Sequence, residues 1–101
     1  MNVVFSSAFK RDLQEASTWY TSILPGLGAE FGERMRSVVQ SIIVREGGDH
    51  IGPHGFRCRK CRPFPHLVYY QISDDTLYLL GVIHKRRHPD HLRRQREKPS
   101  G

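Results

Sequence analysis

SSAFKRDLQEASTWYTSILPGLGAEFGERMRSVVQSIIVR, residues 6–45, contains two amphipathic helical patterns separated by one break. In both patterns apolar side chains recur at steps of three and four, which is the spacing of one face of an α-helix. The first set is Phe9, Leu13, Ala16, Tyr20 and Ile23, and the second is Phe31, Met35, Val38 and Ile42. The stretch therefore predicts two helices that each bury one face.

The ends of these helices have recognisable signals. Ser6 and Ser7 supply N-cap oxygens for a first helix that begins near Ala8. The break at residues 24–28, LPGLG, stops that helix because proline cannot continue it and glycine permits a tight reversal. The second helix is predicted over residues 29–45. Two helices joined by so short a connection are expected to pack as an antiparallel hairpin.

After residue 45 the pattern changes from helix to strand. Residues 46–55, EGGDHIGPHG, form a glycine-rich loop, and residues 73–76, SDDT, form a hairpin connection. Segments rich in β-branched and aromatic residues, or extended and bounded by turn residues, predict strands at 2–5, 56–62, 66–72 and 77–84. The predicted fold is α+β with the order β-α-α-β-β-β, an N-terminal strand and a helical hairpin packed on a small antiparallel sheet.

The size and composition are those of one globular domain. A chain of 101 residues with 38% hydrophobic and 26% charged residues supports a single core. We expect the domain to span residues 1–92 and to be followed by a basic, flexible tail at 93–101. No apolar run reaches the roughly 20 residues of a membrane span, and the N-terminus has no secretory pattern. With only two cysteines, a cytoplasmic location is expected.

Charge is concentrated in the second half of the chain. Residues 1–55 carry five basic and six acidic side chains, a net of −1, whereas residues 56–101 carry eleven and four, a net of +7. Such asymmetry is typical of a surface that binds phosphates or an acidic protein segment. A device that keeps the protein in solution is the alternative.

Four basic residues lie in one predicted strand. Because side chains alternate along a strand, Arg57 and Arg59 share one face and Lys60 and Arg62 the other. A buried sheet face does not hold two unpaired charges, so one pair must reach an edge, a groove or a partner. Guanidinium groups suit phosphate or carboxylate recognition. The alternative is an edge strand charged to prevent edge-to-edge pairing.

A second basic cluster ends the last predicted strand, at His84, Lys85, Arg86 and Arg87. An imidazole beside guanidinium groups has the parts for metal-independent phosphodiester cleavage. The histidine would move a proton, and the arginines would stabilise the charge that develops on phosphorus. A histidine that only packs or hydrogen-bonds at a strand end is the alternative.

His50, His54, Cys58 and Cys61 form the pattern H-x3-H-x3-C-x2-C, which has the residue types of a zinc site. Structural zinc sites have a longer insert between their ligand pairs. If the segment is extended, the two cysteines point to opposite faces and do not converge on a metal. We therefore expect neither a metal nor another cofactor, and no redox pair, since no βαβ context surrounds the cysteines.

Several of these segments resemble the RelE/ParE superfamily of toxins from two-component toxin–antitoxin modules. They are AFKRDLQEASTWY (8–20), PGLGAEF (25–31), FRCRKCRPFPHLVYYQI (56–72) and VIHKRRHP (82–89), and the resemblance runs from Phe9 to about Arg96. It implies the same β-α-α-β-β-β fold and a cognate antitoxin whose acidic, amphipathic segment wraps the toxin.

The resemblance leaves two kinds of target open. RelE-like members cut mRNA on the ribosome without metal, and the matching catalytic positions here are Arg57, Arg62, His84 and Arg86. ParE-like members inhibit DNA gyrase. No tyrosine follows His84, and Gly47-Gly48 replaces the proline common after the second helix, so we favour a ParE-like, growth-inhibiting toxin. A non-catalytic nucleic-acid-binding domain is the third possibility.

For all of these functions the expected contact surface lies in the basic half. The residues expected to bind target or antitoxin are Arg57, Arg59, Lys60, Arg62, Leu67, Tyr69, Lys85, Arg86 and Arg87.

Overall fold

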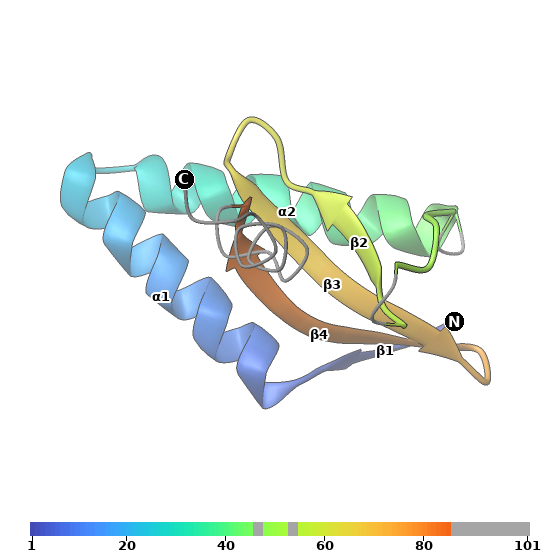
Figure 1. Ribbon diagram of the computed structural model, residues 1–101. Helices are drawn as coiled ribbons and strands as arrows, with labels where there is room; N and C mark the ends of the chain where they lie inside the picture. Colours follow the sequence, from blue (N-terminus) through green and yellow to red (C-terminus); the bar gives the residue numbers. More distant parts are fainter. Residues whose placement is uncertain (46–47, 53–54, 86–101) are drawn as a thin grey trace, which may run out of the picture.

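The computed structural model describes residues 1–45, 48–52 and 55–85. In chain order its elements are β1 (Asn2–Phe5), α1 (Ser7–Ile23), α2 (Leu27–Val44), β2 (Arg57–Lys60), β3 (His66–Ser73) and β4 (Thr76–His84) (Figure 1). The predicted β-α-α-β-β-β order is confirmed. The end of the predicted domain, at 86–92, and the predicted tail, 93–101, lie outside the described residues.

The helical hairpin has the caps and the break that its residues predict. The Ser6 side chain accepts a hydrogen bond from the Phe9 N–H at 3.0 Å and caps α1. Gly26, at φ +91°, reverses the chain in a backbone conformation that favours glycine, so α2 begins at Leu27, two residues earlier than predicted. A Cβ on Gly28 would lie 2.6 Å from the Ser17 carbonyl oxygen of α1. The two helices therefore approach closely because residue 28 has no side chain.

The sheet has the strand order β1-β4-β3-β2. β2, β3 and β4 are antiparallel, as predicted, and β1 adds to β4 as a parallel edge strand, so the sheet is mixed. The predicted strand at 56–62 is shorter than expected and ends at Lys60. Its chain turns at residues 61–65, where two prolines without N–H groups cannot extend a ladder.

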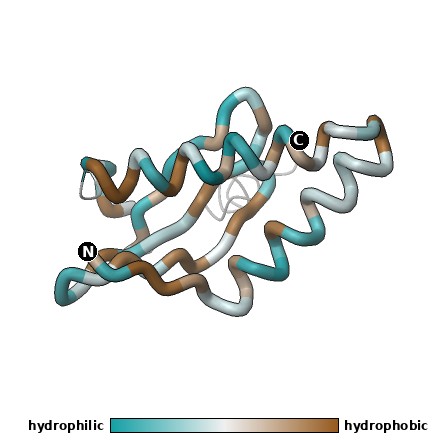
Figure 2. The backbone as a smooth tube through the Cα atoms, turned by 180° about the vertical axis from the view of Figure 1, so that it is seen from behind, coloured by the Kyte–Doolittle hydropathy of each residue, from teal (hydrophilic) through white to brown (hydrophobic). Residues whose placement is uncertain are grey.

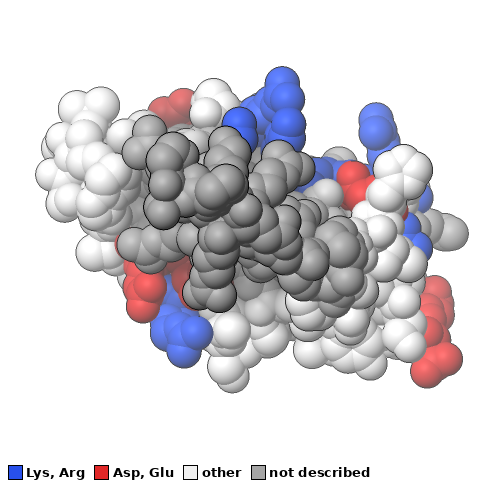
Figure 3. Space-filling model, viewed as in Figure 1, with Lys and Arg blue, Asp and Glu red and all other residues white. Residues whose placement is uncertain are grey.

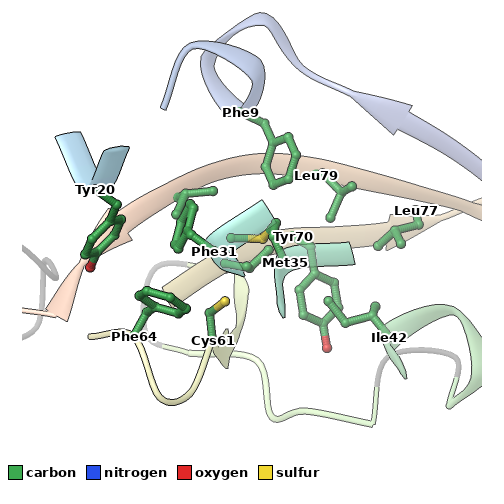
Figure 4. Close-up of a cluster of buried hydrophobic side chains, with 12 residues drawn as sticks. Phe9, Tyr20, Phe31, Met35, Ile42, Cys61, Phe64, Tyr70, Leu77 and Leu79 are labelled. Atoms are coloured by element: carbon green, nitrogen blue, oxygen red, sulfur yellow. The ribbon is translucent and has the colours of Figure 1, made fainter. Parts of the chain in front are cut away.

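The core lies between α2 and one face of the sheet. Phe31, Met35 and Ile42 of α2 pack with Val68 and Tyr70 of β3, and all are buried. Figure 4 shows Cys61 and Phe64 in the same cluster. Viewed from behind, hydrophobic and hydrophilic residues alternate along α2 (Figure 2), as the sequence spacing requires. The opposite face of the sheet carries the alternate side chains, which include Leu67 and Tyr69 of β3. We call this the outer face.

α1 packs along α2 and against β4. β1 pairs only with residues 76–79, so the second half of β4 has no strand on that side. The Asp12 carboxylate accepts a hydrogen bond from the Val82 N–H at 3.1 Å, and the Ser6 hydroxyl donates to the Leu80 carbonyl at 3.0 Å. α1 and its cap thus replace a neighbouring strand along this part of β4.

Candidate functional site

Two of the basic residues of β2 are bound within the molecule. Arg57 and Arg59 pair with Tyr70 and Val68 of β3, so they share the face that α2 covers, as alternation predicts. Arg59 donates from Nε to Asp49 Oδ2 at 2.9 Å and from Nη1 to Ser41 Oγ at 2.7 Å, and its Nη2 lies 2.8 Å from Asp49 Oδ2. Arg57 donates to the main-chain carbonyl of Asp49. The two guanidinium groups therefore hold the loop before β2.

Asp49 is the centre of this polar cluster. Besides Arg59, its carboxylate accepts a hydrogen bond from the hydroxyl of Tyr70, a side chain with 0% exposure. Burial, followed by the hydrogen bond to Asp49, raises the pKa of Tyr70, so its hydroxyl remains a donor. Asp49 binds β2 through Arg59 and β3 through Tyr70, and Arg59 extends the cluster to Ser41 of α2. This role of Asp49 was not predicted from the sequence, although an acidic residue inside a glycine-rich loop just before a basic strand was a usable signal.

Lys60 and Arg62, the other two basic residues of this segment, are exposed. Lys60 ends β2, and Arg62 lies in the turn that follows. Arg34 of α2 donates from Nε to the Arg62 carbonyl at 3.1 Å. In Figure 3 basic side chains project from the edge of the molecule that β2 and α2 form. The four basic residues of the predicted strand thus form an internal pair in β2 and an exposed pair at its end and in the following turn.

The outer face holds the two apolar residues predicted to bind a partner. Leu67 is buried, and Tyr69 is partly buried with its ring centroid 6.1 Å from that of Phe56. Tyr69 also borders a cleft of about 750 Å³ between α1 and the ends of β3 and β4. Two carboxylates, Asp12 and Glu15, and the exposed ring of Trp19 line the α1 side of this cleft.

His84 lines the other side of the cleft, beside a histidine that the sequence analysis did not select. Its register partner in β3 is His66, and the two ring centroids are 5.3 Å apart. His66 Nδ1 lies 3.3 Å from the hydroxyl of Tyr20 in α1. Burial, and then the nearby His84, lower the pKa of His66 to about 4. His66 is therefore neutral near pH 7 and packs α1 against the strand end.

The remaining predicted residues lie near this same end of the sheet. The Lys85 N–H donates to the Pro65 carbonyl at 2.7 Å, while its side chain is exposed. Arg86 and Arg87 lie outside the described residues.

The predicted catalytic residues are not gathered at one point. Arg57 pairs with Tyr70, whereas His84 pairs with His66, which lies four residues before Tyr70 in β3. At the rise of a strand this is a separation of about 13 Å along the sheet, with two strand spacings across it. Arg62 and His84 lie toward the same end, and Arg57 lies at the Asp49 cluster.

The cysteine–histidine pattern is divided between the two faces. Cys61 is fully buried in the core, and burial raises the pKa of its thiol. Cys58 pairs with Tyr69 of the outer face. His54 lies outside the described residues. Within residues 1–45, 48–52 and 55–85, no three His, Cys, Asp or Glu side chains are placed to hold a metal ion.

Comparison with known proteins identifies the family. Residues 3–89 match the ParE toxin of the type II toxin–antitoxin system, parDE. The chain belongs to the ParE toxin family. Its fold is similar to that of a chain from the chromosomal ParDE TA system of P. aeruginosa, with a TM-score of 0.73 and 12% sequence identity, over 83% of this chain and 95% of that one. No curated protein matches the sequence.

The ParE assignment confirms the predicted family and the preference for its ParE-like branch. This ParE-family chain is therefore a toxin of the type II class, built on the predicted α+β fold. In the part that the structure describes, no helix combines the length and the hydrophobicity needed to cross a membrane.

Proposed function

We propose that this protein inhibits bacterial growth by binding DNA gyrase in the cytoplasm and that a cognate antitoxin neutralises it. Membership of the ParE toxin family supports both parts of the proposal. A partner is also consistent with the uneven charge, because an acidic segment would lower the repulsion within the basic half of the chain.

The observation that carries the proposal is the position of Arg57 relative to His84. Arg57 is bound to the loop through Asp49, and about 13 Å of sheet separates it from the row that contains His84. A general acid and the group that stabilises the transition state must both lie within hydrogen-bond reach of one phosphate. Arg57 and His84 therefore do not serve one phosphate together, and this favours a toxin that acts by binding over a ribonuclease that uses both residues.

The proposed contact surface contains Lys60, Arg62, Leu67, Tyr69 and Lys85, on the outer face and the strand end. Arg86 and Arg87 join it on the basis of sequence alone. Arg57 and Arg59 would not contact the target directly but would stabilise the strand that carries this surface, since Arg57 binds Asp49 and Arg59 binds Asp49 and Ser41.

Expression in bacteria tests the activity. The wild-type chain should stop growth and lower DNA supercoiling before translation falls, and His84→Ala should retain this effect. Cleavage of ribosome-bound mRNA that is lost in the His84→Ala variant would instead establish a nuclease.

Hydrogen exchange on the complex tests the antitoxin surface. Co-expression with the neighbouring reading frame should restore growth, and the purified complex should protect the backbone amides of residues 66–70 and 81–85. Protection confined to the solvent-facing side of α2 would place the antitoxin elsewhere.

A further inference from the structure

A groove of about 410 Å³ lies between α2 and β2, at the edge of the sheet. Four basic residues line it: Arg34 from α2, Arg59 and Lys60 from β2, and Arg62 from the turn after it. Val38 and Cys58 add small apolar surfaces. We call this the α2–β2 groove.

The charges that line the groove do not balance. Among its described lining residues, Asp49 is the one carboxylate, and it lies 2.8 Å from Arg59 and accepts the hydroxyl of Tyr70. The four cations thus exceed the one described carboxylate by three charges, and Arg34, Lys60 and Arg62 remain after Arg59 has paired with Asp49. Like charges held in one groove repel each other, and their repulsion falls when an anion binds between them.

The cations are also partly preorganised. Arg34 is anchored by the hydrogen bond from its Nε to the Arg62 carbonyl, which sets its guanidinium across the space between the two elements. A guanidinium held through one N–H keeps the rest of its fork for an oxyanion and loses less side-chain entropy on binding. Lys60 and Arg62 are exposed and can turn toward the same ligand.

We propose that the α2–β2 groove binds phosphate groups of a nucleic-acid backbone through Arg34, Lys60 and Arg62. Among the described residues that line the groove none is aromatic, so they offer bases no surface on which to stack. An acidic protein segment would use apolar anchors beside its carboxylates, and the small apolar patch of Val38 and Cys58 offers little to them. Recognition through phosphates alone makes the binding independent of base sequence.

The inference deepens the proposed function. If the protein acts on gyrase, the groove supplies a contact for the DNA that gyrase holds. The binding itself requires only this chain and an oligonucleotide, so its failure can be distinguished from a failure of growth inhibition.

Fluorescence anisotropy with the full-length protein and an oligothymidylate of roughly 20 nucleotides tests the groove, with an abasic strand of equal length beside it. Each phosphate contact on a single strand contributes about −0.7 to the slope of log K against log salt. Lys60→Ala/Arg62→Ala should therefore weaken that slope by about 1.4. The affinity advantage of the wild type over this variant should then fall about sevenfold between roughly 50 and 200 mM salt.

A matched control is available on α1, where Lys10 and Arg11 are also exposed. Lys10→Ala/Arg11→Ala removes the same charge but lies outside the groove, so it should leave the slope of log K against log salt nearly unchanged. Other basic segments contribute equally to both double variants, so the difference between the two slopes reports on the groove. Thermal unfolding of each variant checks that it folds.

The oligothymidylate and the abasic oligonucleotide should bind with equal affinity. Inorganic pyrophosphate should compete weakly because it offers fewer charges than the polymer. Equal slope changes in the two double variants would overturn the proposal. Tighter binding of polyglutamate than of the abasic oligonucleotide would also overturn it, since the ligand would then be an acidic protein. Tighter binding of pyrophosphate would overturn it as well, since the ligand would then be a small phosphate compound.

Discussion

Replacing Asp49 by alanine removes an acceptor that the Arg59 guanidinium and the Tyr70 hydroxyl share. A hydrogen bond to a charged group contributes about 1.5–3 kcal/mol, and a buried hydroxyl that loses its acceptor costs about 1–3 kcal/mol. The side chains of Arg59 and Asp49 are 15% and 25% exposed, so water replaces part of what is lost. We expect Asp49→Ala to lower the free energy of unfolding by about 3 kcal/mol, toward the lower end of the values for a broken buried pair.

In a domain of this size about 3 kcal/mol corresponds to a fall in Tm of roughly 15 °C. Urea unfolding followed by circular dichroism measures the free energy, and thermal unfolding gives the Tm. Glu33→Ala is the matched control, because it breaks an Arg–carboxylate pair whose side chains, Glu33 and Arg36, are 73% and 75% exposed. That pair should contribute only about 0.3–0.5 kcal/mol.

Tyr70→Phe separates the two parts of the cluster. It removes the hydroxyl and keeps the ion pair, so it should cost about 1 kcal/mol, and a double-mutant cycle with Asp49→Ala should show coupling of about 1 kcal/mol. Because the pKa of Tyr70 is raised in the folded state, its contribution is complete below about pH 10 and is lost as the pH rises further. An Asp49→Ala cost equal to that of Glu33→Ala would refute this account of the cluster.

Three other predictions follow from the packing. Gly28→Ala should lower the free energy of urea unfolding by about 1–3 kcal/mol, since its Cβ would meet the Ser17 carbonyl oxygen at 2.6 Å. The Cβ of Gly32→Ala meets nothing within 4 Å, so this variant should raise that free energy by about 0.5–1 kcal/mol. Equal effects of the two variants would contradict the close approach of the helices at residue 28. The pKa of His66 is lowered to about 4, so its contribution to stability should be complete above pH 6.5 and should fall as the pH drops toward 4. His66→Gln should flatten that part of the stability–pH profile. An unchanged profile would rule out a neutral, buried His66 as the cause of this pH dependence. Cys61→Ser places a hydroxyl in the core and should lower the free energy of unfolding, followed by thermal unfolding, by about 1–3 kcal/mol. Cys58→Ser is the control and should have a smaller effect. Similar losses of stability in the two variants would argue against a core role for Cys61.

The elements were predictable because their signals are local. The apolar spacing within each helix, such as that of Phe31 and Met35, is a property of neighbouring turns, and it predicted both helices and most of their buried faces. Ile23, the last residue of the predicted stripe of α1, is 54% exposed instead, because it lies at the end of the helix. The pairing of β1 had no such signal. Whether a short N-terminal strand pairs in parallel or antiparallel depends on where the hairpin returns the chain, and α1 decides this by packing along β4.

The candidate site was predictable only in part. Alternation predicted correctly that Arg57 and Arg59 share a face. It did not predict that Asp49 and Ser41 would bind Arg59, because these residues come from a loop and a helix that only the folded chain brings together. For the same reason Arg34 could not be assigned to the groove, and His66 could not be selected as the neighbour of His84 before the strand register was known.

The feature that the sequence by itself determined is a small α+β domain with an excess of positive charge in its second half. Both follow from the order of the residues, since periodicity and charge are counted along the chain. The tertiary structure alone decided how that charge is used. A charge is compensated or available according to which groups surround it in space, so Asp49 binds Arg59 internally while Lys60 and Arg62, only a few residues away, remain exposed at the edge of the sheet.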